Sequence, residues 1–145
     1  MIKEIKIFWK RITQNVYEQN VNYFEIKEFL EKKFPSCQVE VTDLRKKCCN
    51  YQVLKTLASM IPIKKRNYLK ETFDCEDFAI IAWGFWKYFF PRLAIGMALV
   101  DTKQGKHALN CAIYKTKSGN IQFTFIEPQT GKVFFSNWKP YKIWI

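Results

Sequence analysis

The sequence predicts a single α+β domain in which helices pack on an antiparallel β-sheet. Three features favour this class: apolar residues at helical spacing early in the chain, an almost wholly apolar middle segment, and short alternating segments separated by turn residues after it. The 145 residues fit one domain, and 48% hydrophobic residues suffice for a core. We therefore expect one unit over residues 1–145, mainly helical over 1–62, with a central helix and the sheet over 63–145.

The expected helical part begins with an amphipathic segment over residues 2–19. Its apolar stripe consists of Ile2, Ile5, Trp9, Ile12 and Val16. Asn22 followed by Glu25 is a capping box that opens a second helix, and Pro35 prevents this helix from continuing. Val39 and Val41 alternate with polar residues, which indicates a short strand.

A third helix is expected to begin at a cap, Thr42 or Asp43, and to end at Pro62. Its buried stripe would consist of Leu44, Cys48, Tyr51, Leu54, Leu57 and Ile61. Residues 63–72 are basic and irregular.

The second half of the chain predicts a central helix followed by a meander. Asp74 is a good N-cap, and Phe78–Phe90 is apolar on nearly all sides, as in a buried helix. Strands are expected over residues 94–100, 107–116, 121–127 and 133–136. The apolar run Phe78–Val100 contains Lys87, Pro91 and Arg92, so we expect a helix and a strand there rather than a membrane span.

The charge of the chain favours an anionic partner. Lys and Arg number 24 against 13 Asp and Glu, which gives a net charge of +11. The candidate ligands for a nucleotide or another acidic ligand are Lys46, Lys47, Lys64, Lys65 and Arg66. The alternative interpretation is a solvated basic face.

The cysteine count and the N-terminus indicate a reducing, cytoplasmic compartment. Five Cys is an odd number, and residues 1–11 scatter charges among apolar residues, unlike a signal peptide. Zinc is disfavoured because the chain has no Cys-x-x-Cys and a single His.

Three residues are candidates for chemistry. His107, the one His, opens a strand directly after a polar turn, and His is the usual acid–base group near neutral pH. Cys75 follows Asp74 in the first helical turn, where the helix dipole favours a thiolate. Glu127 ends a strand and would orient an imidazole. The alternatives are a structural His and a solvent-facing acid.

The apolar pattern tests whether His107 and Glu127 can meet. The odd-numbered residues of 107–113 and of 121–127 form the apolar faces of two adjacent strands. A loop Lys117-Ser118-Gly119 with Gly119 in the left-handed region places both faces together. Thr116 then lies opposite Asn120 and His107 opposite Gln129, so that Glu127 becomes a diagonal neighbour of His107.

Three strings resemble a known family: FDCEDFA at Phe73–Ala79, GKHALN at Gly105–Asn110 and IEPQT at Ile126–Thr130. They are similar to the calcium-dependent, papain-like cysteine protease domain of Marasmius-agglutinin-type chimerolectins, and to small phage and bacterial proteins. The resemblance covers residues 66–136. It implies a papain-like fold in which the central buried helix packs on the sheet, whereas the expected N-terminal helices have no counterpart in the resemblance.

The resemblance also implies roles for individual residues. Cys75, His107 and Glu127 would form a catalytic triad. Glu76, Asp77 and Gln129, together with Glu127, would hold a divalent cation, calcium or manganese. Lys106 stands where the family often has Gly before the His, a departure that leaves the triad intact.

The functional prediction is a papain-like cysteine hydrolase acting on a peptide or other acyl substrate in the cytoplasm of a bacterium or a phage-infected host. The alternative is a basic protein that binds or degrades a nucleotide or nucleic acid, such as a phage counter-defence protein. A third hypothesis is a partner-binding protein that forms oligomers through its N-terminal helices.

Overall fold

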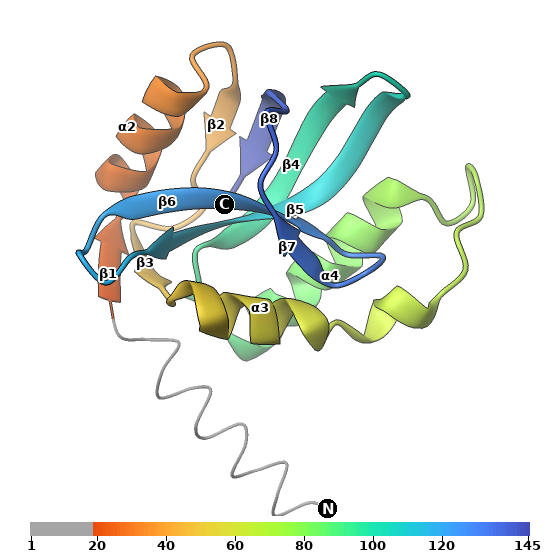
Figure 1. Cartoon of the computed structure of the whole chain (residues 1–145), viewed down its shortest axis with the longest axis horizontal. Helices are drawn as coiled ribbons and strands as arrows, with labels where there is room; N and C mark the ends of the chain where they lie inside the picture. Colours follow the sequence, from red (N-terminus) through yellow and green to blue (C-terminus); the bar gives the residue numbers. More distant parts are fainter. Residues whose placement is uncertain (1–18) are drawn as a thin grey trace, which may run out of the picture.

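Residues 19–145 are described by a computed structural model, which confirms the α+β class (Figure 1). The six-stranded sheet has the order β2-β8-β4-β5-β6-β7, and only β2 and β8 run parallel. Its strands are β2 (Gln38–Glu40), β4 (Ile95–Thr102), β5 (Gly105–Lys115), β6 (Ile121–Glu127), β7 (Lys132–Phe134) and β8 (Pro140–Trp144). A separate ribbon pairs β1 (Gln19–Asn22) with β3 (Arg45–Cys48) in antiparallel register.

Three α-helices cover this sheet within the described residues. They are α2 (Tyr23–Lys33), α3 (Tyr51–Ser59) and α4 (Cys75–Phe89), and a short 3₁₀ helix, η1, spans Pro62–Lys65. Figure 1 shows α2 and α3 on opposite sides of β6. Ile26 and Leu30 of α2 pack with the odd-numbered residues of β5, whereas Trp86 of α4 packs with the even-numbered ones.

The register predicted from the apolar faces is confirmed. Asn110 pairs with Ile126 and Lys115 with Ile121, and the same register places Thr116 opposite Asn120, whose carbonyl accepts the Thr116 N–H at 3.0 Å. Gly119 has φ 84°, in the left-handed region that the loop requires. The ladder ends at Asn110–Ile126, however, so the expected pairing of His107 with Gln129 is not formed.

The first half of the chain differs most from expectation. The capping box at Asn22 is confirmed: its side chain accepts the Glu25 N–H, and the Glu25 carboxylate accepts the Asn22 N–H. The helix expected from residue 43 is wrong over its first turns, because residues 45–48 are strand β3 and Asn50, not Thr42 or Asp43, caps α3. Residues 19–62 are therefore mixed rather than mainly helical, and the helix expected over 2–19 lies outside the described residues, apart from Gln19 in β1.

Strand alternation explains why β3 replaces the expected helix. Lys46 and Cys48 are buried, whereas Leu44, assigned to the apolar stripe, is 75% exposed. Because β3 pairs with β1 across an intervening helix, its cross-strand partners could not be read from local spacing. Strand β8, absent from the prediction, likewise depends on long-range pairing with β4 and β2.

The central helix is half-buried rather than enclosed. Asp74 caps it as predicted, and Phe78, Ala79, Ala82 and Trp86 are buried. The opposite side is exposed at Ile80, Ile81, Tyr88 and Phe89. These exposed residues face away from the sheet, because only one side of α4 packs against it. Among residues 19–145, no helix combines the length and apolarity needed to cross a membrane.

Candidate active site

Cys75 is the first residue of α4, and the local sequence fixes that start. The Asp74 side chain accepts the N–H of Glu76 at 3.1 Å, and the Asp77 carboxylate accepts the N–H of Asp74 at 3.0 Å. This reciprocal capping box holds the helix N-terminus, with its positive dipole end, at the thiol.

The thiol lies against strand β5. The backbone N–H of Ala108 donates a hydrogen bond to Cys75 Sγ at 3.4 Å. The Cys75 side chain also packs against a small cluster of Ala79, Met97 and Ala108. These contacts fix the position of the sulfur against the strand.

His107 and Glu127 are in direct contact on neighbouring strands. His107 Nε2 lies 2.9 Å from Glu127 Oε2, and both side chains are about one-fifth exposed. The second carboxylate oxygen, Glu127 Oε1, accepts the backbone N–H of Gln129 at 3.2 Å, which fixes the carboxylate. Since Nε2 is engaged, Nδ1 is the ring nitrogen left for proton exchange.

One hollow of about 390 Å³ brings the three candidates together. The same residues that the sequence singled out therefore share one surface with Gln129. The described lining residues are Tyr68, Cys75, Thr102, Gln104, Gly105, Lys106, His107, Glu127, Gln129 and Trp138.

Sequence reasoning missed several lining residues, above all Trp138. Its ring meets the His107 imidazole edge-on, with centroids 6.1 Å apart at 78°. Trp138 lies between β7 and β8, where no periodicity marks it. Tyr68 and Gln104 come from irregular segments as well. In each case the only signal is proximity in the fold.

The other four thiols contrast with Cys75. All five cysteines are free. Burial raises the pKa of Cys37 to about 11, and that of Cys48 and Cys49 to about 12. Burial also raises the pKa of Cys111. These four groups are thus held as neutral thiols near neutral pH.

The residues expected to hold a cation differ in exposure and in hydrogen bonding. Glu76 is exposed, and Asp77 and Glu127 already accept protein hydrogen bonds. Gln129 lines the hollow beside Glu127. Over residues 19–145, no group of three or more His, Cys, Asp or Glu side chains gathers in a way that would hold a metal ion.

The expected anion ligands lie in different places. Lys46 is buried, with Nζ 2.8 Å from Asp43, and it lines a separate hollow together with Lys47. The Arg66 guanidinium instead lies over the Phe73 ring, 4.6 Å from its centroid. The side chains of Lys64 and Lys65 are outside the described part of the chain.

Comparison with known proteins identifies the fold. No family model and no curated protein matches the chain. A solved structure described as a PSL1a–E64 complex has a TM-score of 0.71 at 19% identity, over 87% of this chain and 50% of that chain. Polyporus squamosus lectin bound to a human-type influenza-binding epitope has a TM-score of 0.68 at 20% identity, over 87% of this chain and 49% of that one.

The chain thus spans about half the length of these structural neighbours. At such identity the likeness concerns the fold alone. Three helices on a mostly antiparallel six-stranded sheet match a papain-like α+β domain.

Proposed function

We propose that this chain is a papain-like cysteine hydrolase that cleaves or transfers an acyl group, most simply at a peptide bond. The observation that carries the proposal is the His107–Glu127 hydrogen bond of 2.9 Å in the hollow that also contains the Cys75 thiol. A nucleophile, a base and a group that orients the base are the parts that nucleophilic acyl transfer requires.

The proposed reaction begins when His107 Nδ1 takes the proton from Cys75 Sγ. The thiolate attacks the acyl carbon and forms a carbon–sulfur bond, and the imidazolium returns the proton to the leaving amine as the carbon–nitrogen bond breaks. Water, activated by the same imidazole, then hydrolyses the thioester. The products are a carboxylic acid and the free thiol.

Glu127 is the positioning residue in this proposal. By accepting the hydrogen bond from Nε2, it fixes the tautomer with Nδ1 free and stabilises the imidazolium that forms. The Gln129 N–H on the other carboxylate oxygen limits rotation of Glu127. In this proposal the backbone N–H of Cys75, at the head of α4, donates to the developing oxyanion.

The structural neighbour supports a peptide-like substrate. That protein was solved in complex with E64, a peptide-like epoxide that alkylates thiols. We assign no step to calcium or manganese, because Asp77 and Glu127 are committed to other hydrogen bonds. A response of activity to either cation stays a prediction from the resemblance.

E64 labelling of the full chain tests the proposal. Intact-mass spectrometry should show one adduct, and peptide mapping should place it on Cys75. The Cys75→Ala variant should form none, while the matched Cys37→Ala control should label fully. A His107→Gln variant that labels at the native rate would contradict the assigned base. Hydrolysis of a peptide library by the native chain, and none by Cys75→Ala, completes the test.

A further inference from the structure

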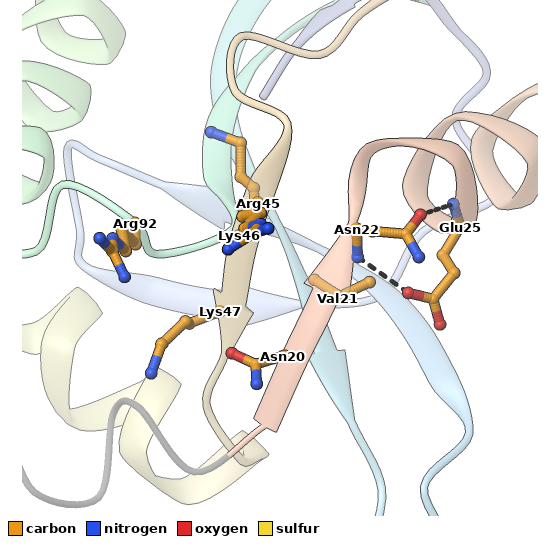
Figure 2. A pocket seen from close by; sticks show the side chains of 8 residues that line it. All are labelled: Asn20, Val21, Asn22, Glu25, Arg45, Lys46, Lys47 and Arg92. Atoms are coloured by element: carbon orange, nitrogen blue, oxygen red, sulfur yellow. Dashed lines mark hydrogen bonds between the residues drawn. The ribbon is translucent and has the colours of Figure 1, made fainter.

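We propose that a second hollow, separate from the thiol site, binds a compact polyphosphate anion. It has a volume of about 370 Å³ and is lined by the β1–β3 ribbon, the start of α2 and the loop after α4. Its lining residues are Asn20, Val21, Asn22, Glu25, Arg45, Lys46, Lys47 and Arg92 (Figure 2). The two hollows share no lining residue.

The helix α4 separates the two hollows. Cys75 begins this helix of 15 residues, and Arg92 lies just beyond its end. At a rise of about 1.5 Å per residue, the helix spans about 22 Å. A ligand at Arg92 therefore does not reach the reacting atoms of the proposed hydrolase.

The ribbon register gathers polar and cationic side chains on one face. Asn22 lies opposite Arg45, and Asn20 lies opposite Lys47. Because side chains alternate along strands, these two pairs share a face, and Val21 and Lys46 point to the other. Val21 and Lys46 are buried accordingly, at 2% and 1% exposure. The ribbon thus offers two cations flanked by amide side chains.

Arg92 adds a third cation from a different segment, and the backbone fixes its position. The Lys47 N–H donates to the Arg92 carbonyl at 2.7 Å, and the Ala94 N–H donates to the Lys47 carbonyl at 2.8 Å. The loop after α4 is therefore joined to β3 on both sides of Arg92. Figure 2 shows Arg92, Arg45 and Lys47 around the same recess.

The charges of Arg45 and Arg92 are not balanced by any residue that the structure describes. The guanidinium groups of Arg45 and Arg92 form no hydrogen bond or ion pair with any residue that the structure describes, and both residues are exposed. The Lys46 ammonium is instead bonded to Asp43 and Thr42. Among the described lining residues Glu25 is the one carboxylate, and it accepts the Asn22 N–H at 2.8 Å. An anion would relieve the mutual repulsion of the cations.

The composition of the lining indicates the ligand class. Guanidinium groups bind phosphate oxygens in a bidentate manner, and Asn amides add donors. None of the described residues that line the hollow is aromatic, so they offer no surface on which a base would stack. Recognition of charge without a base points to a diphosphate or triphosphate group rather than to a nucleobase.

Calorimetric titration of the full chain with inorganic tripolyphosphate at low salt tests the proposal. Arg45→Gln/Arg92→Gln should raise the Kd at least roughly tenfold, because two charge-assisted contacts are lost. The matched control Lys32→Gln/Lys132→Gln removes the same charge from exposed positions outside this hollow and should change the Kd less than about twofold. Equal losses in both variants would show non-specific attraction and overturn the site.

A second variant acts in the opposite direction. Glu25→Gln removes the one carboxylate among the described lining residues while a Gln still completes the capping box, so binding should tighten. Unchanged binding would contradict the proposed placement.

A single-stranded oligonucleotide serves as the alternative ligand. If it bound more tightly than tripolyphosphate, with the same dependence on Arg45 and Arg92, the proposal of a compact polyphosphate ligand would also be overturned. E64 labelling of Cys75 should be unaffected throughout, so this inference and the hydrolase proposal fail independently.

Discussion

The hollows at the two ends of α4 differ in whether their polar groups already have partners within the protein. At the thiol end, the polar groups are already joined to one another: His107 to Glu127, Glu127 to Gln129, and Cys75 to the Ala108 N–H. At the other end, Arg45 and Arg92 have no partner among the described residues. Groups that react must be held in one orientation before substrate arrives. Groups that bind a charged ligand can instead keep their hydrogen-bond donors free for that ligand.

The largest expected difference between the two hollows follows from removal of the Cys75 thiol. Cys75→Ala should lower peptide hydrolysis by about 10⁴-fold or more, because the covalent route disappears. Tripolyphosphate binding should be unchanged. Parallel assays of peptide cleavage and calorimetry on the same preparation check both. Full hydrolysis by Cys75→Ala would place the chemistry elsewhere.

Removing the orienting carboxylate should cost less than removing the nucleophile. Glu127→Gln preserves shape but cannot stabilise an imidazolium or specify the tautomer, so kcat should fall by about 10²- to 10⁴-fold with little change in KM. The pH profile of kcat should also move, which a purely structural role would not cause. Glu40→Gln, at an exposed acid paired with Lys142, is the control and should retain activity.

The contact between His107 and Glu127 could be predicted from the sequence because it depends on strand alternation. Apolar faces on β5 and β6 require the observed register, and Gly119 supplies the loop conformation. From that register His107 and Glu127 fall on one face, although the ladder ends before His107. The head of α4 was also predictable, because Asp74 and Asp77 form a local capping box.

The remainder depends on contacts between distant segments. Lys46 is charged, so its sequence position gives no sign that it is buried. In the structure its side chain is buried and forms an ion pair with Asp43. Arg92 enters the second hollow only because the loop after α4 pairs with β3. Trp138 meets His107 from a segment without periodicity. Local spacing contains none of these relations, so the first-half strands and most of the second hollow could not be predicted.

Asp43 pairs with Lys46, a lining residue of the second hollow, and its loss should destabilise the fold. Asp43 Oδ2 accepts hydrogen bonds from Lys46 Nζ at 2.8 Å and Lys87 Nζ at 2.7 Å, which ties β3 to α4. Asp43→Asn would leave Lys46 buried without a counter-ion and lower the free energy of unfolding by about 2 kcal/mol, moderated by the exposure of Asp43 and by Thr42. Urea denaturation measures this. Lys87→Met should cost less than about 1 kcal/mol.

The same carboxylate gives a pH dependence with a definite sign. Hydrogen bonds from Lys46 and Lys87 hold the pKa of Asp43 well below its usual value. Its contribution to stability is therefore complete above the ordinary carboxyl pKa of about 4 and is lost as the pH falls toward the lowered value. The difference in unfolding free energy between the native chain and Asp43→Asn should shrink with acid. A constant difference down to pH 2 would contradict this assignment.

Thiol reactivity should distinguish Cys75 from every other cysteine. At pH 7.5 iodoacetamide should modify Cys75 at least about tenfold faster than the next thiol, because burial keeps the others protonated, with a pKa of about 11 at Cys37 and about 12 at Cys48. Timed quenching and peptide mapping give the individual rates. Faster modification of Cys48 or Cys49 would show that the buried thiols open more readily than their packing indicates. Saturating tripolyphosphate should leave the Cys75 rate unchanged, since the ligand binds at the other end of α4.

The smallest effect is expected at Arg66, a basic residue that the sequence had offered as an anion ligand. Its guanidinium lies over the Phe73 ring, and Phe73 in turn meets Phe78 edge-on at 4.9 Å, beside the start of α4. Arg66 therefore contributes to packing, worth about 0.5–1 kcal/mol at an exposed site. Arg66→Gln should lower the free energy of unfolding by that amount and leave the tripolyphosphate Kd unchanged. If the Kd instead rose as it does in Arg45→Gln/Arg92→Gln, the anion would span both ends of α4, and the separation between a reacting end and a binding end would not hold.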